Sequence, residues 1–278
     1  MQEFYKYHGA GNDFILIDNM NGQTALSQEQ VVLLCDRHKG VGADGVIFLE
    51  KSSKADCFMN YCNSDGSFVE MCGNGIRCLA KFFLEQIKSQ ENKVKELSID
   101  TRAGIKKIVC NDDGSFSVNM GAPVFSHTDF PDGSLTLENF SFNFVSMGNP
   151  HAVSLVKNIF EIDLPKVGPK IENDSHFPNK INVELVEKVR DDYFKVKVWE
   201  RGSGATLSCG TGACAAYACV RQPARNASRS EAGGDLAEIA EREITLEFPG
   251  GKLYLSQNEK GEIILRGPAE FVFKGEIK

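Results

Sequence analysis

Two cysteines each stand directly before a Gly-x-Gly turn at the start of a helix-compatible segment. Cys72 begins CGNG and Cys209 begins CGTG, and their separation, 209 − 72 = 137 residues, is close to half of the 278-residue chain. A helix N-terminus presents unpaired backbone N–H groups and the positive end of the helix dipole, which favour a thiolate and can hold a carboxylate. The pattern therefore indicates thiol acid–base chemistry on a small carboxylate ligand.

Two such thiols on related halves of a chain suit the inversion of a stereocentre. One group removes a proton from one face of a carbon, and the other returns a proton to the opposite face. The two thiols must rest in opposite protonation states, because two close thiols do not easily both ionise. We expect N–H groups of Gly73, Asn74, Gly210 and Thr211 to hold the developing negative charge. The chemistry needs no metal and no cofactor, so we predict neither.

The surrounding segments predict that the chain arose by duplication. At the fixed offset of 137, features of the second half fall on features of the first without a gap. The aligned pairs are Gly11-Asn12 with Gly148-Asn149, GVIFLE at 45–50 with NVELVE at 182–187, and Asn63 with Glu200. Beyond the cysteines the offset lengthens to 146 or 147, where residues 98–104 meet residues 245–251. Two copies predict two similar domains, not a short-period repeat protein.

Each half reads as several strands, one principal helix and further strands. The runs FILID, GVIFLE, FKVKVW and KLYL are typical of strands, whereas residues 76–88 and 213–221 are compatible with helices. We predict an α+β fold of two pseudo-symmetric domains, roughly residues 1–120 and 121–265, each a mixed or antiparallel sheet wrapped around a central helix. The second helix is rich in Ala and Cys and should be buried nearly all round.

Bulk composition narrows the function class. The net charge is −7, without a block of Lys and Arg to contact a phosphate backbone, so we predict no nucleic-acid partner. No apolar run approaches the ~20 residues of a membrane span, and the amino terminus lacks the pattern of a signal peptide. We therefore expect no membrane partner, a cytoplasmic location, and nine cysteines that remain thiols.

Taken together, the motifs resemble those of the diaminopimelate epimerase family along essentially the whole chain. The matching segments are HGAGNDF, RHKGVGADG, NSDGS, MCGNGIRC, SMGNPHAV, IN at 181–182, ERGSG, SCGTGACAA and PGG. The resemblance implies a cofactor-independent interconversion of LL- and meso-diaminopimelate, which feeds lysine and cell-wall synthesis in bacteria. It implies Cys72 and Cys209 as the acid/base pair in a cleft between the lobes. It also implies that residues 266–278 return to the first lobe.

The resemblance further implies a set of residues that hold the non-reacting amino-acid end of the substrate: Asn12, Asn63, Asn149, Asn182, Glu200 and Arg201. An Arg fork suits a carboxylate, and Glu200 suits an ammonium group. Taken singly, each Asn reads equally well as a turn residue. His151 is a candidate for touching the substrate or stabilising the Cys209 proton, with a purely structural role as the alternative.

Other predictions and rival functions stay open at this level. We expect Arg77 to be structural, Asp44 to shape a turn, Lys6 and Arg37 to lie on the solvated surface, and the polar stretch 221–242 to form a surface loop. A homodimer is a candidate assembly. The rivals are a racemase of another amino acid, whose proline-specific relatives show CGHG, a thiol redox or metal-binding protein, and a non-catalytic amino-acid binding module.

Overall fold

The computed structural model describes residues 2–87, 94–226 and 243–277. It divides the chain into two compact units. The N-terminal unit comprises Met1–Asn119 and Arg266–Lys278, and the C-terminal unit comprises Met120–Leu265. The chain thus leaves the first unit once and returns to it for its last strand.

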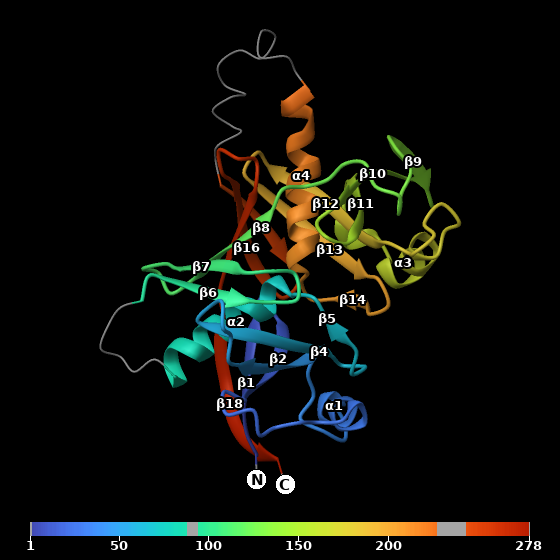
Figure 1. The fold of residues 1–278 in the computed structure, drawn as a ribbon. Helices are drawn as coiled ribbons and strands as arrows, with labels where there is room; N and C mark the ends of the chain where they lie inside the picture. The colour runs from blue at the N-terminus through green and yellow to red at the C-terminus, as the bar shows by residue number, and fades with distance from the viewer. Residues whose placement is uncertain (1, 88–93, 227–242, 278) are drawn as a thin grey trace. The chain divides into compact units, whose positions relative to one another are not determined.

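In the N-terminal unit, strands surround one long helix (Figure 1). Its elements are β1 (Gln2–Gly9), β2 (Asn12–Asp18), α1 (Gln28–Cys35), β3 (Gly45–Glu50), β4 (Cys57–Asn63), β5 (Phe68–Val69), α2 (Gly73–Gln86), β6 (Glu96–Asp100), β7 (Lys106–Cys110), β8 (Phe116–Gly121) and β18 (Glu270–Ile277). In Figure 1 the red β18 runs beside the blue β1, with which it pairs antiparallel, so both chain ends lie in this unit.

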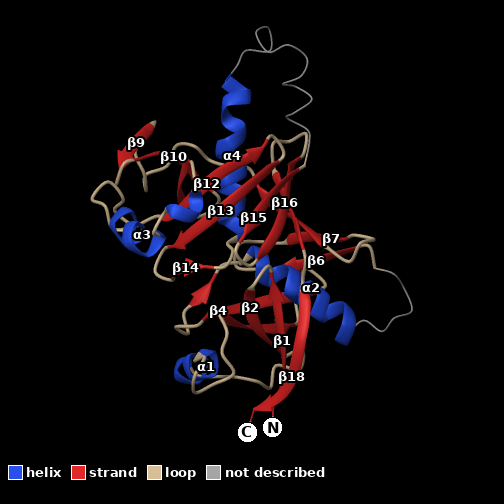
Figure 2. Cartoon of the chain, turned by 180° about the vertical axis from the view of Figure 1, so that it is seen from behind, coloured by secondary structure: helices blue, strands red, loops and turns tan. Residues whose placement is uncertain are grey.

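The C-terminal unit repeats the plan around α4, which lies among the strands in Figure 2. Its elements are β9 (Ser134–Leu137), β10 (Phe140–Ser146), β11 (Pro150–Val156), the 3₁₀ helix η1 (Ile159–Glu161), α3 (Leu164–Glu172), β12 (Asn182–Arg190), β13 (Tyr193–Glu200), β14 (Gly204–Thr206), α4 (Gly210–Asn226), β15 (Ile244–Phe248), β16 (Gly251–Gln257) and β17 (Ile263–Gly267). Both units mix parallel and antiparallel strand pairs, as the sequence analysis allowed.

Strand order is the same in the two units. In the first, β1, β2, β3, β4, β6 and β7 are neighbours in that order, with β5 also on β4. In the second, β10, β11, β12, β13, β15 and β16 follow each other, with β14 also on β13. The predicted internal duplication is therefore visible in the topology.

The duplication extends to the register of individual residue pairs. Adding 137 to both members of a pair in the first unit gives a pair in the second: Phe14 opposite Gly45 becomes His151 opposite Asn182, Val46 opposite Cys62 becomes Val183 opposite Trp199, and Tyr61 opposite Val69 becomes Val198 opposite Thr206. After the helices the offset is 147, where Ile99 opposite Lys106 becomes Leu246 opposite Leu253. Since a slip of one residue would turn every side chain to the other face of its sheet, this agreement fixes which side chains correspond.

Each unit encloses its own helix. Helix α2 packs on β1, β2, β3 and β6, and α4 packs on β10, β11, β12 and β16. All residues from Gly212 to Cys219 are buried, which confirms the prediction of a helix buried nearly all round. Its small Ala and Cys side chains let the surrounding sheet approach closely. Residues 221–226 continue α4, so the predicted loop starts too early, and residues 227–242 lie outside the described residues.

Two tight turns deliver asparagines to the starts of corresponding strands. Ala10 and Gly11 have φ of 52° and 80° and join β1 to β2 as a two-residue hairpin, with Gly9 opposite Asn12. Gly148 has φ of 94° in the turn between β10 and β11. Because glycine adopts positive φ without steric cost, Gly11 and Gly148 allow the chain to reverse directly before Asn12 and Asn149.

Candidate active site

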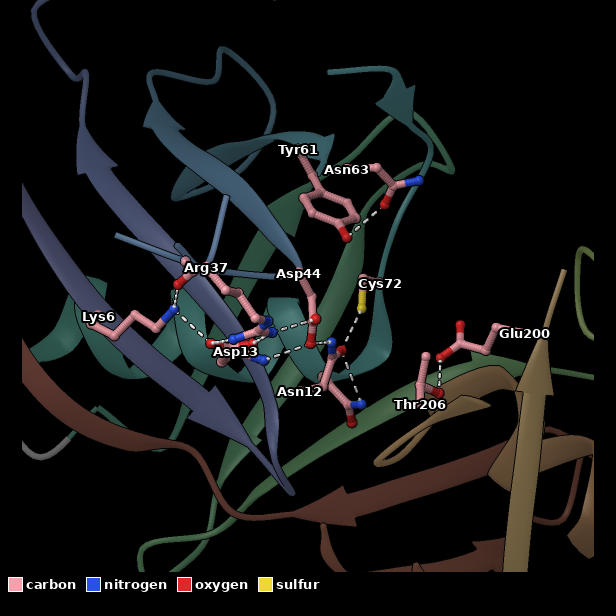
Figure 3. Close-up of polar contacts among 12 residues, drawn as sticks. Lys6, Asn12, Asp13, Arg37, Asp44, Tyr61, Asn63, Cys72, Glu200 and Thr206 are labelled. Carbon is pink, nitrogen blue, oxygen red and sulfur yellow. Dashed lines mark hydrogen bonds and ion pairs between the residues drawn. The ribbon is translucent and has the colours of Figure 1, made fainter. Parts of the chain in front are cut away.

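Cys72 lies at the N-cap of α2, as the sequence predicts. Its Sγ accepts a hydrogen bond from the Gly75 N–H at 3.5 Å and donates one to Asn12 Oδ1 at 3.6 Å, and the residue is partly exposed. Figure 3 shows the sulfur above the Asn12 side chain. Cys72 thus has a backbone donor that can stabilise a thiolate and a side-chain acceptor that can take the thiol proton.

The orientation of the Asn12 amide is fixed from both sides. Its Nδ2 donates to Asp44 Oδ2 at 2.6 Å, and its Oδ1 accepts from Asn74 Nδ2 at 3.2 Å. Asn74 is fully buried, and its own Oδ1 accepts from Arg77 Nη2 at 2.8 Å. Since a carboxylate only accepts and a guanidinium only donates, Asp44 and Arg77 together require the Asn12 oxygen to face Cys72.

Arg77 is structural, as the sequence predicts. It is fully buried and also donates to the carbonyl oxygens of Gly73 at 2.9 Å and Pro268 at 3.2 Å, so it ties the start of α2 to the segment that leads into β18. Asp44 does more than shape a turn, because it holds Asn12.

The surface prediction is wrong for Lys6. It is 6% exposed, and its Nζ lies 2.6 Å from Asp13 Oδ2 and donates to the Gly42 carbonyl oxygen. Arg37 is half-exposed and pairs with Asp13 at 2.6 Å and Asp44 at 2.8 Å (Figure 3). Burial alone would raise the pKa of Asp13, but the hydrogen bonds from Arg37 and Lys6 outweigh it and lower the pKa to about 2.

Asn63 lies at the end of β4, where its Oδ1 accepts from the Tyr61 hydroxyl at 2.8 Å (Figure 3). The bond leaves the Asn63 Nδ2 as the group with which a ligand carboxylate could pair.

Cys209 occupies the corresponding position directly before α4. Its Sγ accepts from the Gly212 N–H at 3.3 Å and lies 3.4 Å from Thr211 Oγ1. Burial raises the pKa of Cys209 well above its usual value, and the charges of Glu200 and Glu184 raise it further. The hydrogen bonds with Thr211 and the Gly212 N–H lower the pKa of Cys209, but they do not compensate for these effects.

Glu200 ends β13 and is fixed by Thr206, whose hydroxyl donates to Oε1 at 2.5 Å (Figure 3). Burial raises the pKa of Glu200, although the bonds from Thr206 and Cys209 partly offset it. The charge of Glu200 in turn raises the pKa of Cys209.

Arg201 and Asn182 are linked to each other. Asn182 Oδ1 accepts from the Arg201 backbone N–H at 2.9 Å, and Asn182 Nδ2 donates to the Pro150 carbonyl oxygen at 2.8 Å. The Arg201 side chain is exposed, and one of its nitrogens bonds the Asn179 carbonyl oxygen at 3.0 Å. Asn182 is 3% exposed, so its present role is to hold the turn that carries Arg201.

His151 and Asn149 form a group with Glu184, a residue that the sequence analysis did not single out. His151 Nδ1 lies 2.7 Å from Glu184 Oε1, and His151 Nε2 lies 3.0 Å from Asn149 Oδ1. His151 and Glu184 are both fully buried. The signal for Glu184 was present in the 137-residue alignment, where NVELVE places a carboxylate on an apolar position of GVIFLE.

Two further searches cover the described residues. Their His, Cys, Asp and Glu side chains form no group of three or more that could hold a metal ion. Within the same ranges, none of the helices combines the length and apolar composition needed to cross a membrane.

Solved structures with the same fold come from several enzyme groups. A phenazine biosynthesis protein of the PhzF family from Bacillus anthracis matches with a TM-score of 0.68 at 20% identity, over 100% of this chain and 99% of that chain. A hydroxyproline epimerase from Agrobacterium vitis matches with a TM-score of 0.68 at 15% identity, over 99% and 90% of the two chains. These likenesses concern the fold alone, and they confirm the predicted α+β fold.

Sequence comparison is more specific. The family model described as "Diaminopimelate epimerase" matches residues 4–126 and 143–272. A protein named "Diaminopimelate epimerase" from Rippkaea orientalis (strain PCC 8801 / RF-1) is 43% identical over 289 residues, 98% of each chain. Its namesake from Trichodesmium erythraeum (strain IMS101) is 43% identical over 292 residues, 99% of each chain. Since the family model spans residues of both units and these relatives match over nearly the full length, the chain belongs to the diaminopimelate epimerase family.

Proposed function

We propose that this protein interconverts LL- and meso-2,6-diaminopimelate, in lysine and peptidoglycan precursor synthesis, with Cys72 and Cys209 as its acid/base pair and without a cofactor. The observation that carries the proposal is the repeated thiol position. Each cysteine precedes the helix of its unit and accepts a hydrogen bond from the glycine three residues on, Gly75 or Gly212. The two units supply the related thiols that a two-base inversion needs.

In this mechanism one cysteine accepts a proton from the substrate and the other cysteine donates a proton to it. A thiolate on one face takes the α-proton of the substrate and becomes a thiol, and the thiol on the other face gives its proton to the resulting carbanion and becomes a thiolate. In LL-diaminopimelate this converts one L centre to D. The N–H groups of Gly73, Asn74, Gly210 and Thr211 stabilise the charge on the neighbouring carboxylate.

In the direction in which Cys209 is the base, its thiolate must form against the burial and the neighbouring carboxylates that raise its pKa. At the Cys72 side, Asn12 Oδ1 holds the thiol hydrogen and therefore suits Cys72 to start as the acid in that direction. The roles exchange when the reaction runs backwards.

We propose that the non-reacting amino-acid end binds to Asn12, Asn63, Asn149, Asn182, Glu200 and Arg201. The free Nδ2 of Asn63 and the exposed Arg201 fork suit a carboxylate, and the Glu200 carboxylate suits an ammonium group. Asn182 contributes to binding indirectly, because its side chain accepts the Arg201 backbone N–H and so holds the turn that carries Arg201. We also propose that the N-terminal and C-terminal units act as the two lobes of the enzyme.

The test is incubation of the reduced protein with LL-diaminopimelate in deuterium oxide, without added cofactor. Stereoisomers are separated by chiral chromatography, and α-deuterium is measured by mass spectrometry. The proposal predicts meso product that carries one α-deuterium. Protein with both thiols free that gives neither inversion nor exchange would refute it and would favour another amino acid as substrate.

We further propose a homodimer that forms through β18. Phe271, Val272 and Phe273 are 47%, 50% and 43% exposed on this strand, which pairs with β1. Such a run of apolar residues on an exposed strand suits burial against a second copy. Val272→Asp should reduce the molar mass measured by light scattering, whereas Val189→Asp, at a residue 51% exposed on β12, should leave it unchanged. A monomeric parent protein would exclude this assembly.

A cytoplasmic location is also proposed, on the basis of the cysteines. All nine are thiols outside disulfides, and seven are buried, as suits a reducing compartment. Fractionation of the source cells tests it, and recovery of the protein outside the cytoplasm would contradict it.

A further inference from the structure

In the part of the chain that the structure describes, a buried imidazole–carboxylate pair lies beside Cys209 and none lies beside Cys72. His151 on β11 and Glu184 on β12 are both fully buried, with 2.7 Å between His151 Nδ1 and Glu184 Oε1. Since a carboxylate oxygen only accepts, Nδ1 carries the hydrogen of this bond. The other ring nitrogen, Nε2, faces the Asn149 side-chain amide, with 3.0 Å between Nε2 and Oδ1.

The duplicated frame shows what the other unit has in the same places. At the offset of 137, His151 corresponds to Phe14 and Glu184 to Ile47. The surroundings agree: a Cβ added to Gly75 would lie 3.0 Å from Ile47 Cδ1, and one added to Gly212 would lie 2.6 Å from Glu184 Oε1. Both side chains therefore fill the space beside the helix start in their own unit.

Packing alone does not account for Glu184. An isoleucine fills the corresponding space in the N-terminal unit without burying a charge. The Oε2 atom of Glu184 is buried and has no hydrogen-bond partner among the described residues. Burying an acceptor without a partner destabilises the fold, and burying a charged acceptor destabilises it more. A carboxylate at this position is thus a feature of the site and not of the fold.

We propose that Glu184 is a positioning residue of the Cys209 side of the site, where it holds His151 against Asn149 and places beside Cys209 a buried negative charge that the Cys72 side lacks. The first part of this proposal rests on the proposed function, because it gives Asn149 a role in substrate binding. The second part concerns the free protein. Glu184 would make the two related thiols chemically unequal.

The charge lies close enough to Cys209 to act on it. The Gly212 Cβ position is 2.6 Å from Glu184 Oε1 and 3.2 Å from Cys209 Cβ, so Oε1 lies within about 6 Å of Cys209 Cβ. At such a distance, in a buried setting, a carboxylate charge disfavours ionisation of the neighbouring thiol.

Four titratable groups face Glu184 from the packed elements: His151 on β11, Glu200 on β13, and Cys209 and Cys219 at and within α4. Burial raises the pKa of both thiols, and Glu184 raises each further, that of Cys219 to about 12.

The test is the pH dependence of thiol alkylation in the free protein, with Glu184→Gln against the parent. Iodoacetamide is the probe, and peptide mass spectrometry resolves Cys209 from Cys72, which serves as the internal reference. Glutamine keeps the size and an acceptor oxygen but removes the charge. We expect the Cys209 profile to move to lower pH, with alkylation about tenfold faster at pH below its midpoint, and the Cys72 profile to stay in place.

A second variant tests whether a change in packing, and not the loss of the Glu184 charge, shifts the Cys209 alkylation profile. His151→Phe with Glu184→Ile installs the pair that the N-terminal unit already accommodates, and it should keep the far-UV circular dichroism while shifting the Cys209 profile in the same direction. For Glu184→Gln, we also expect kcat/KM for LL-diaminopimelate to fall about tenfold.

The outcomes separate the claims. A Cys209 alkylation profile that matches the parent in both folded variants overturns the proposal, even if their thermal stability falls. A shifted profile in a protein that does not epimerise diaminopimelate upholds the electrostatic role and refutes the proposed function. An unchanged kcat/KM in Glu184→Gln overturns the positioning of Asn149.

Discussion

Gly75 and Gly212 are matched positions, 137 residues apart, but an added methyl group meets different neighbours in the two units. At Gly212 the new Cβ would lie 2.6 Å from Glu184 Oε1, which cannot retreat without loosening its bond to His151. At Gly75 it would lie 3.0 Å from Ile47 Cδ1 and 3.1 Å from Met59 Cε, the ends of flexible apolar side chains. Gly212→Ala should therefore destabilise the protein more than Gly75→Ala.

The magnitudes follow from three terms. In both variants, alanine gains about 1 kcal/mol over glycine inside a helix. At Gly212 the weakened bond between His151 and Glu184 costs about 1.5–3 kcal/mol, because one partner is charged. At Gly75 the crowding of Ile47 and Met59 costs about 1 kcal/mol. The expected net change is a loss of about 0.5–2 kcal/mol for Gly212→Ala and about zero for Gly75→Ala.

Urea unfolding at neutral pH measures the difference. Trp199 is the only tryptophan of the chain and lies in the C-terminal unit, so its fluorescence reports the unit that carries Gly212. Far-UV circular dichroism reports both units, and disagreement between the two probes would reveal separate transitions. Equal midpoints for the two variants, or a larger loss for Gly75→Ala, would refute the reasoning about Glu184.

Further predictions concern the thiols, the substrate and pH. Cys72→Ser and Cys209→Ser should each lower kcat at least about a hundredfold with unchanged far-UV circular dichroism, and wild-type turnover in either would remove the acid/base assignment. Arg201→Lys should raise KM through loss of the bidentate fork, and unchanged steady-state kinetics would contradict that role. The ion pairs with Lys6 and Arg37 lower the pKa of Asp13 from about 4, its value in an unfolded chain, to about 2 in the folded protein. The stability that these ion pairs contribute is therefore fully present above pH 4 and is lost as the pH falls to 2. Asp13→Asn should lose less stability over that interval in urea titrations, and an equal loss would exclude the ion pairs as its source.

Much of the fold could be predicted because the duplication constrains it twice. The strands at 14–18, 45–50, 194–199 and 252–255 and both principal helices occur as the sequence predicts. Their local pattern determines them: apolar, β-branched runs form strands, and each Gly-x-Gly turn precedes a helix. The sequence of either half alone does not predict the order of the strands or their register. The structure was needed to show that the strand partners in one unit correspond to those in the other.

The site was predictable where a motif carried it and not where a contact did. The position of Cys72 and Cys209 before their helices followed from the local sequence. The burial of Lys6 did not, because it depends on Asp13 and on the Gly42 carbonyl oxygen, which only the folded chain brings near. Glu184 was missed for a similar reason, since a carboxylate in a strand reads as solvent-facing until its neighbours are known.

The central claim is that two thiols act on opposite faces of one carbon, and isotope placement at low conversion tests it most directly. Pure LL-diaminopimelate is incubated in deuterium oxide, and after a few per cent of reaction the α-deuterium content of the product and of the remaining substrate is measured separately. Two thiols predict deuterium at the inverted centre of the meso product and none in the recovered LL-isomer, because the donor has exchanged with solvent and the acceptor holds the substrate proton. Product that retains the substrate hydrogen would show that one group both removes and returns it, and would contradict the account.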